Sequence, residues 1–198
     1  GHDAAASILG VKSKYLYDVI NRNVGIRAKN FMQLMETAQM PVQNEFVQLY
    51  TKGKSIPSEI VLTEDLCTFF GLWMAEGSYF AGGARISIHR KEEKVMADLC
   101  AKLFGNLTIY RKPESQGCDI LMCSTALKIL MKDILGFKSG ARNKEVPDLI
   151  YNLPKEQLAA FLRGFTTGDG SLNTKTPAPM VEIDTESPKL ADDLAYLF

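Results

Sequence analysis

The chain has 198 residues, of which 46% are hydrophobic and 23% charged. This composition is typical of a soluble globular protein with one large domain, or a domain plus a small module. No apolar run approaches the ~20 residues that span a bilayer, and no signal-peptide pattern opens the chain. We therefore expect a cytoplasmic protein with no membrane partner. The four cysteines form no Cys-x-x-Cys pair and have no zinc-site spacing with the two histidines, so we interpret them as reduced, mostly core thiols.

The formal net charge is zero at pH 7, but the charges are unevenly distributed. Residues 11–29 carry five basic side chains and one acidic (net +4), and residues 85–112 carry seven and three (net +4). Residues 181–198 carry one basic side chain and five acidic (net −4). Basic stretches of this kind fit a nucleic-acid face, and equally fit solvated helix faces.

The first 40 residues are predicted to form a small all-α module that resembles a helix-turn-helix. Such a motif needs a small residue, a turn glycine and two core contacts at fixed places, which are Ala6, Gly10, Val11 and Ile20 here. Ser13 would cap the second helix, and residues 31–38 would form a supporting helix. The second helix would present exposed or phosphate-side residues to DNA, namely Lys12, Lys14, Tyr15, Tyr17 and Arg22. A plain helical bundle with a basic face fits the same pattern. Residues 41–55 are predicted to be a linker.

The next predicted helix contains FFGLWMAEG (69–77). Thr63 is a suitable N-cap, and the acids at positions 64 and 65 are favourable in a first turn. The helix is expected to end at Glu76-Gly77, because glycine commonly follows the last helical residue.

Two hairpins are predicted after this helix. In ARISIHR (84–90) the alternation places Ile86 on a packed face and Arg85, Ser87 and His89 on a polar, basic face. Residues 106–125 indicate a second hairpin, with LTIY and DILMC on either side of a Pro-Glu-Ser-Gln-Gly turn.

A second glycine-terminated helix begins near Pro154 and runs into LRGFTTGDG (162–170). It aligns with the first helix as part of an internal repeat. Gly71 falls on Gly164, Glu76 on Asp169, and the following Gly-Ser on Gly-Ser. ARISI (84–88) then matches PMVEI (179–183), and MADLCAKLF (96–104) matches LADDLAYLF (190–198). We assign one unit to residues 56–140 and a second, incomplete unit to residues 141–198.

Small residues four apart let helices pack closely, and here they are Gly71 with Ala75 and Gly164 with Gly168. If the two repeat helices pack together through these pairs, Glu76 and Asp169 meet at one end. Two adjacent carboxylates repel unless a cation is present, and Mg²⁺ favours few carboxylates supplemented by water and phosphate oxygens. Ordinary helix ends followed by turn residues remain the alternative interpretation.

FFGLWMAEG and LRGFTTGDG resemble the two motifs of the LAGLIDADG homing endonucleases, and NKEVPDLI (143–150) resembles the block between the motifs in the intein-encoded branch. The resemblance covers roughly residues 56–198. It implies an α+β fold of pseudo-twofold αββαββα units, with the motif helices at the interface and the sheets forming a saddle over DNA. It further implies a monomer that cuts both strands of a long target site.

The same resemblance implies roles for individual residues. Glu76 and Asp169 would bind Mg²⁺ or Mn²⁺, and Lys144 would assist catalysis. The sheet would contact double-stranded DNA through Arg85, Ser87, His89, Arg111 and Lys112. The corresponding strand of the second unit instead carries Glu182 and Asp184, which suit phosphate poorly. Because the chain neither starts with Cys or Ser nor ends in His-Asn, we expect an endonuclease portion or a free-standing relative, without splicing activity.

Three other functions remain open from sequence. A DNA-binding regulator could retain this fold without cutting, although a pure binder has no need of both carboxylates. An RNA-intron maturase would use the same fold, and an endonuclease that has lost activity would keep the same motifs.

Overall fold

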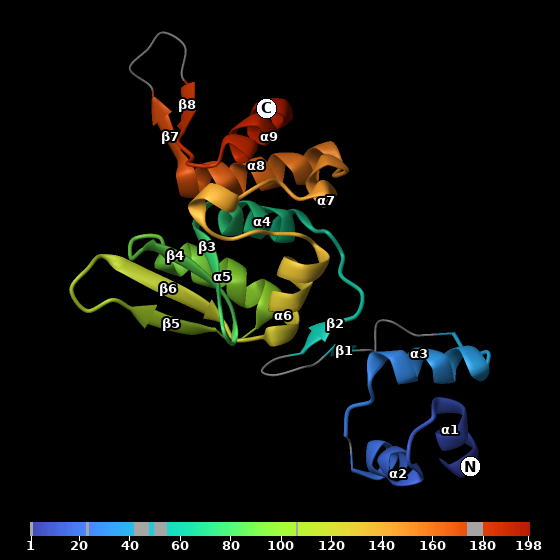
Figure 1. Cartoon of the computed structure of the whole chain (residues 1–198). Helices are drawn as coiled ribbons and strands as arrows, with labels where there is room; N and C mark the ends of the chain where they lie inside the picture. The colour runs from blue at the N-terminus through green and yellow to red at the C-terminus, as the bar shows by residue number, and fades with distance from the viewer. Residues whose placement is uncertain (1, 23, 42–47, 50–54, 106, 174–179) are drawn as a thin grey trace. The chain divides into compact units, whose positions relative to one another are not determined.

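The computed structural model of the chain describes residues 2–22, 24–41, 48–49, 55–105, 107–173 and 180–198. It comprises two compact units, one of residues 1–50 with 57–59 and one of residues 51–56 with 60–198 (Figure 1). Two short strands, β1 (Gln48–Leu49) and β2 (Ile56–Pro57), pair with each other. Most of the predicted linker lies outside the described residues. No helix in the described ranges is both long and apolar enough to cross a membrane.

The N-terminal unit contains three short helices: α1 (His2–Leu9), α2 (Ser13–Asn21) and α3 (Ala28–Thr37). Its small core consists of Ala6, Leu9 and Leu16. Gly10 makes the turn between α1 and α2 with φ +62°, a backbone conformation that glycine adopts without a steric penalty. This apolar core and the glycine turn hold α1 and α2 together as one small helical module.

Three sequence expectations for this unit are wrong. Ser13 is the first helical residue rather than the cap, and its hydroxyl donates to Asp3 Oδ1 at 2.5 Å, which ties α2 to α1. Ile20 is 65% exposed, because Leu16 occupies the core side of α2. Tyr15 is packed against the core, and its hydroxyl accepts a hydrogen bond from the Arg27 backbone N–H at 3.0 Å.

The larger unit has two runs of elements with the same order. The first is α4 (Glu64–Glu76), β3 (Gly77–Phe80), β4 (Gly83–His89) and α5 (Glu93–Phe104). The second is α8 (Lys155–Asp169), β7 (Gly170–Asn173), β8 (Met180–Ile183) and α9 (Pro188–Leu197). Between them lie β5 (Thr108–Arg111), β6 (Gly117–Met122), α6 (Thr125–Ile129), a π-helical turn (Leu130–Ile134), a 3-10 turn (Ala141–Asn143) and α7 (Asp148–Tyr151).

An antiparallel sheet in the order β3-β4-β6-β5 forms one layer of this unit (Figure 1). Ile86 on β4 faces Ile120 on β6, and both are fully buried under the helices. Arg85 and Ser87, which alternate with these residues, remain partly exposed. The predicted alternation is confirmed, and the sheet has one packed face and one open face. The predicted hairpin after residue 106 is also confirmed as β5–β6.

Helix α4 lies between the sheet and α8 (Figure 1). Thr63 caps it as predicted, since its hydroxyl oxygen accepts a hydrogen bond from Leu66 N–H at 3.2 Å. Consecutive residues on α4 are buried, including Phe69, Trp73 and Met74 at 0% exposure. A helix that is apolar on all sides is one that the rest of the fold surrounds.

The contact between α4 and α8 depends on glycine. A Cβ atom added at Gly71 would lie 2.0 Å from the Phe161 carbonyl oxygen, and one at Gly164 would lie 2.1 Å from the Thr68 carbonyl oxygen. A Cβ at Gly168 would lie 2.5 Å from Ala75 Cβ. These distances are far inside van der Waals contact, so the backbones approach as closely as glycine allows.

The glycines that follow the two helices do not have the backbone conformation that the sequence predicts for a glycine cap. Gly77 and Gly170 have φ −84° and −93°, which is extended backbone and not the left-handed conformation of a glycine cap. Each begins a strand directly. A Cβ at Gly77 would lie 2.2 Å from the Trp73 carbonyl oxygen, and one at Gly170 2.5 Å from the Thr166 carbonyl oxygen. Close approach to the last helical turn therefore accounts for glycine at both places.

We expect Gly164→Ala to destabilise this unit by about 1–3 kcal/mol or more, because the new methyl group meets backbone that cannot rotate away. Urea unfolding followed by fluorescence of Trp73, the only tryptophan and fully buried, measures this loss. Gly117→Ala is the matched control, since its Cβ would meet only side-chain atoms of Lys112 and Ser115, the nearest at 3.4 Å. Equal stability of both variants would contradict glycine-dependent packing.

Candidate functional site

Two carboxylates end the two packed helices. Glu76 is the last residue of α4 and Asp169 the last of α8, and both are partly buried. A Cβ at Gly168 would lie 3.3 Å from Glu76 Cγ, so Gly168, the residue before Asp169, lies close to the side chain of Glu76. The tight glycine contact between the helices thus fixes where both acids lie.

The surroundings of both acids disfavour their charged forms. Burial raises the pKa of Glu76, and the neighbouring charges of Asp169 and Glu92 raise it further, while Lys144 lowers it. Burial also raises the pKa of Asp169, again opposed by Lys144. The helix C-termini add partial negative charge at the same place. A cation at this position would relieve all of these unfavourable interactions.

Lys144 lies beside the two acids. Its ammonium donates a hydrogen bond to the carbonyl oxygen of Ala75, in the last turn of α4. Burial lowers the pKa of Lys144, and the charges of Asp169 and Glu76 act in the opposite direction. The structure thus brings together all three residues that the resemblance assigned to catalysis.

The segment carrying Lys144 is held by α9. Buried Ser187 donates from its hydroxyl to the Lys144 carbonyl oxygen at 2.6 Å. Buried Asp193 accepts from the Val146 N–H at 3.0 Å and from Lys189 Nζ at 2.5 Å. Burial would raise the pKa of Asp193, but these hydrogen bonds outweigh it and hold that pKa below its usual range. Sequence analysis missed both anchors, because their only signal is a Ser and an Asp within an acidic C-terminal stretch.

A cleft of about 240 Å³ opens next to Glu76. Its walls come from the ends of α4 and α8, from β4 and from the start of α5. Its polar lining includes Glu76, Ser87, His89, Glu92 and Thr167. His89 Nδ1 accepts from the Lys91 N–H at 3.1 Å, which in a neutral ring leaves Nε2 as a donor. The cleft therefore extends from Glu76 to polar residues of β4.

Two carboxylates suit an ion such as Mg²⁺ or Mn²⁺, which takes few ligands from protein, better than a metal ion that is coordinated entirely by protein side chains. In the described ranges, no cluster of three or more His, Cys, Asp or Glu residues could enclose a metal ion. Glu76 and Asp169 offer two oxygen ligands beside an open cleft. Mg²⁺ commonly takes one or two carboxylates and completes its octahedron with water and phosphate oxygens.

The sheet residues assigned to DNA do not all lie on one face. Arg85 and Ser87 lie on the open face, and His89 is exposed at the end of the same strand. Arg111 lies opposite buried Cys118, hence on the helix-covered side, where it forms a two-point ion pair with Glu93 of α5. Arg111 therefore does not share the open face with Arg85 and Ser87, because it lies on the same face as Ile109, which lies opposite buried Ile120. Its predicted role in DNA binding stays a prediction.

The register instead brings residues to the open face that sequence analysis did not select. Tyr110 on β5 lies directly opposite Asp119 on β6, and Asp119 lies opposite Ser87. Tyr110 is 53% exposed, whereas Asp119 is 5% exposed. The alternation within DILMC marks Asp119 as polar among apolar neighbours, but only strand pairing shows its position in the middle of the face.

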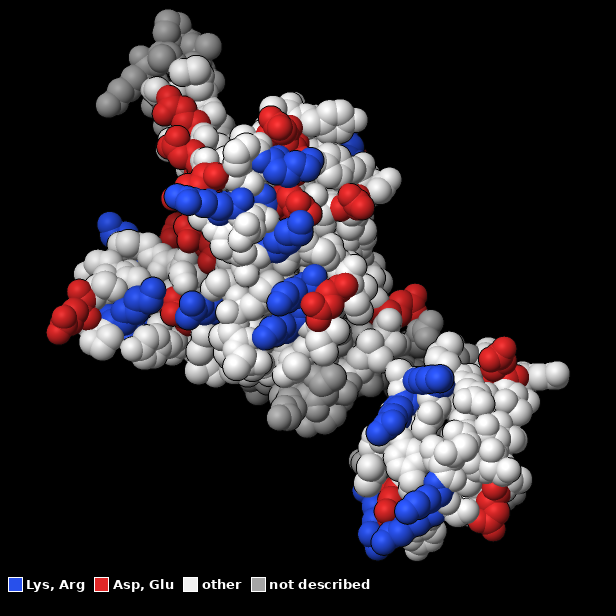
Figure 2. Space-filling model, viewed as in Figure 1, with Lys and Arg blue, Asp and Glu red and all other residues white. Residues whose placement is uncertain are grey.

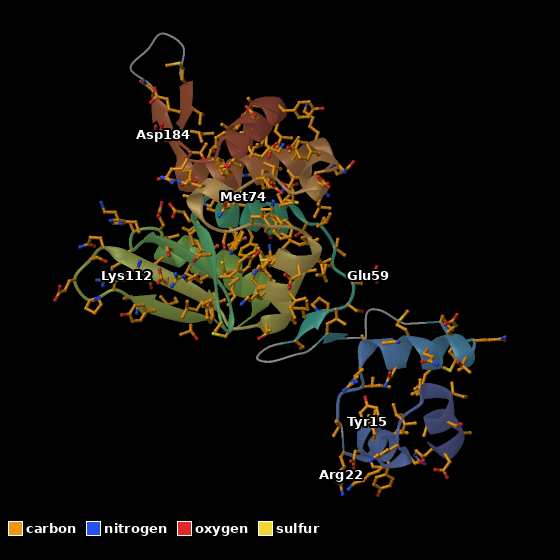
Figure 3. All side chains as sticks on the ribbon, viewed as in Figure 1. Tyr15, Arg22, Glu59, Met74, Lys112 and Asp184 are labelled. Carbon is orange, nitrogen blue, oxygen red and sulfur yellow. The ribbon has the colours of Figure 1, made fainter. Side chains whose placement is uncertain are left out.

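The charged stretches noted in the sequence contain exposed side chains in the structure. On the N-terminal unit Lys12, Lys14 and Arg22 are exposed, and Arg22 pairs with Asp18 at 3.2 Å. Glu182 on β8 is exposed, as expected, and accepts a hydrogen bond from Asn173 at 2.9 Å. Figure 2 shows acidic side chains in the region of β7 and β8. Asp184 follows the last residue of β8 (Figure 3).

Comparison with known proteins supports part of this interpretation. Residues 156–198, which comprise α8 beyond its first residue, β7, β8 and α9, match the LAGLIDADG-like domain family. The LAGLIDADG resemblance is therefore confirmed for this segment. The intein-encoded branch and the helix-turn-helix stay predictions.

Several archaeal proteins are similar to longer parts of the chain. The uncharacterized protein MJ1054 of Methanocaldococcus jannaschii is 27% identical over 94% of this chain and 22% of its own length. The DNA-directed RNA polymerase subunit Rpo1C of the same organism is 28% identical over 73% of this chain and 17% of its own length. A DNA polymerase of Thermococcus hydrothermalis is 30% identical over 54% of this chain and 6% of its own length. The chain thus spans less than a quarter of each of these relatives.

We expect Glu76→Gln and Asp169→Asn each to stabilise the protein at pH 7 by up to about 1 kcal/mol, a small effect because both side chains are half exposed. The folded state favours the protonated carboxyls. Their stabilising contribution is therefore full below the unfolded pKa of about 4 and is lost as pH rises through the raised folded pKa. Urea unfolding followed by Trp73 fluorescence should show the gain at pH 7 and not at acid pH.

Asp98→Asn, an exposed acid on α5, is the matched control and should change stability by less than about 0.5 kcal/mol at either pH. Destabilisation at pH 7 by the two site variants would contradict this account of the carboxylate pair.

Proposed function

We propose that this chain is the DNA-cleaving part of a LAGLIDADG homing endonuclease, which cuts both strands of a long target site by metal-dependent phosphodiester hydrolysis. The observation that carries the proposal is the meeting of Glu76 and Asp169 at the ends of two helices packed through glycine, with Lys144 beside them. Ordinary helix ends have no reason to place two partly buried carboxylates together.

Each residue has a chemical task in this proposal. Glu76 and Asp169 would hold Mg²⁺ or Mn²⁺, and the ion when bound would activate water and stabilise the leaving oxygen. Lys144, whose ammonium is already directed to the end of α4, would place positive charge beside the scissile phosphate. The cleft leads from Glu76 to Ser87 and His89, so a duplex on the open face of the sheet would bring a phosphate to the acids.

The similar proteins support the interpretation that this segment is inserted into different host proteins. An RNA polymerase subunit and a DNA polymerase each match this chain over less than a fifth of their own length. Proteins with such different names share a segment most simply when it has been inserted into each. We propose the intein-encoded branch on this ground, together with the NKEVPDLI block (143–150). The matching order of α4-β3-β4-α5 and α8-β7-β8-α9 supports a monomer with pseudo-twofold repeats.

A DNA-binding protein that does not cut is the second candidate, and two acids, Glu182 in β8 and Asp184 just after it, favour it. Exposed Glu182 lies where the second unit would present a basic strand to phosphate. The N-terminal helices, with their exposed lysines, would then supply much of the DNA contact. The carboxylate pair argues against this candidate, since without a metal it repels phosphate.

Cleavage of a duplex library by the full chain in Mg²⁺ tests the proposal. We expect site-specific double-strand cuts that fall by at least about 100-fold in Asp169→Asn and in Glu76→Gln, because each removes charge stabilisation worth several kcal/mol. DNA binding, measured in Ca²⁺, should survive both substitutions. Asp98→Asn is again the control and should cut as the unmodified chain does.

Sequence-selective binding without any cut, unaffected by either substitution, would overturn the endonuclease and favour the non-cutting protein. Binding to neither DNA nor RNA would overturn both. Preference for structured RNA over duplex DNA in the same assay would indicate a maturase.

We expect Lys144→Met to slow cleavage by about 10- to 100-fold with little change in DNA affinity, because it removes one charge near the reacting phosphate and none from the sheet face. Rates at saturating DNA separate the two effects. A matched loss of affinity, or a similar loss in the surface variant Lys155→Met, would show that Lys144 acts only as general positive charge.

A further inference from the structure

A buried carboxylate lies under the open face of the four-stranded sheet. Asp119 on β6 is 5% exposed, yet two half-exposed cations are directed to it. Lys112 Nζ lies 3.4 Å from Oδ1, and Arg85 Nη1 lies 3.9 Å from Oδ2. Lys112 follows β5 at the end of the sheet (Figure 3). The carboxylate cannot reach a ligand itself, so any effect it has on a ligand must act through these two side chains.

The Asp119 carboxylate attracts its two cationic partners because one of its oxygens lacks a hydrogen bond within the described ranges. Among the described residues, Oδ1 of Asp119 has no hydrogen-bond partner of good geometry, although Lys112 is within ion-pair distance. A buried, incompletely bonded carboxylate costs free energy and attracts nearby donors. This attraction restrains both cations over the middle of the face.

Arg85 has a second anchor on the neighbouring strand. Its Nε–H donates to Ser78 Oγ at 2.8 Å, and Ser78 is its direct cross-strand partner on β3. A guanidinium offers five N–H donors in a rigid plane. The hydrogen bond from Nε to Ser78 and the longer ion pair of Nη1 with Asp119 restrict the orientation of this plane, and Nη2 is engaged by no hydrogen bond in the described part of the chain.

A restrained guanidinium is suited to reading a base rather than holding a phosphate. An arginine in a fixed plane can donate to O6 and N7 of guanine in the major groove, whereas a mobile cation binds any phosphate. The single acid also lowers the charge of the group from two positive to one. That reduction weakens sequence-independent binding, which depends on the number of phosphates neutralised.

We propose that Asp119 is a positioning residue for DNA sequence recognition, which together with Ser78 orients Arg85 to read a guanine in the target site. This inference rests on the proposed function and adds to it the chemistry of one base contact. Lys112 lies on the other side of Asp119 and supplies a phosphate contact. Neither role follows from charge alone, because Asp119 opposes the positive potential that non-specific binding requires.

Selection of bound duplexes tests the proposal. The full chain is incubated with a duplex library that has a randomised segment, with Ca²⁺ in place of Mg²⁺ so that bound DNA is recovered whole. The same selection is run on Asp119→Asn, Ser78→Ala, Arg85→Ala and Lys112→Ala. Asp65→Asn is the matched control, because Asp65 also pairs with a lysine, Lys102, but on α4 and α5.

We expect the unmodified chain to enrich a sequence with a guanine that Arg85→Ala no longer selects. Asp119→Asn and Ser78→Ala should lose about 5- to 150-fold of the preference at that same position, the range for one good arginine–guanine contact. Asp119→Asn should also bind unrelated DNA more tightly with a steeper salt dependence, since it removes a negative charge. Lys112→Ala should weaken binding to all sequences alike, and Asp65→Asn should keep the original preference.

Two results would overturn the inference, and they differ in what they say of the proposed function. If Asp119→Asn and Ser78→Ala keep the original preference, Asp119 is not a positioning residue, while sequence-specific binding stands. If the unmodified chain enriches no sequence, site-specific recognition fails and the inference fails with it. If altered Trp73 fluorescence shows that Asp119→Asn does not fold, the test rests on Ser78→Ala, because Ser78 is only partly buried.

Discussion

The close backbone contact between α4 and α8 determines where the candidate catalytic groups lie. The two helices approach so nearly that a methyl group at Gly71 or Gly164 would overlap carbonyl oxygens of the partner helix. With the helices held in this register, their last residues, Glu76 and Asp169, must share one small region. The strands β3 and β7 begin immediately afterwards, so the same contact also sets where each hairpin leaves the helix pair.

The site formed in this way is electrostatically unfavourable in the free protein. Burial and mutual repulsion disfavour the charged carboxylates, and Lys144 offsets this only in part. Such a site would favour binding of a cation, and it costs stability in the free protein, as is common where a fold supports chemistry. Hydrogen bonds from Ser187 and Asp193 to the backbone of residues 144–146 hold the segment that carries Lys144.

The open sheet face shows the same principle in a different setting. Asp119 is buried beneath Arg85 and Lys112 and forms ion pairs with both, while Ser78 gives Arg85 a second anchor. Buried polar groups that are incompletely satisfied are expensive, and they are usually found where geometry matters more than stability. The cleft beside Glu76 extends to Ser87 and His89 on β4, so recognition and hydrolysis would share one continuous surface.

The sequence alone determined the features that depend on local patterns. The repeated helix with an internal glycine and a terminal acid, the Thr63 cap and the alternation in β4 all follow from residue spacing, and the structure contains each of them. The pairing of Glu76 with Asp169 was also predictable, because the repeat implied a helix pair.

Only the tertiary structure decided which side chains share a surface across strands. Asp119 was overlooked as a neighbour of Arg85 and Lys112, because alternation gives the face on which a strand residue lies, whereas the pairing register between strands decides which residues lie beside it. The ion pair of Arg111 with Glu93 likewise depends on how α5 covers the sheet. Ile20 and Tyr15 were misplaced for a related reason: in a unit with a core of three buried residues, small changes in helix rotation decide which side chain is covered. Local periodicity is short-range information, whereas register and rotation are set by contacts between distant segments.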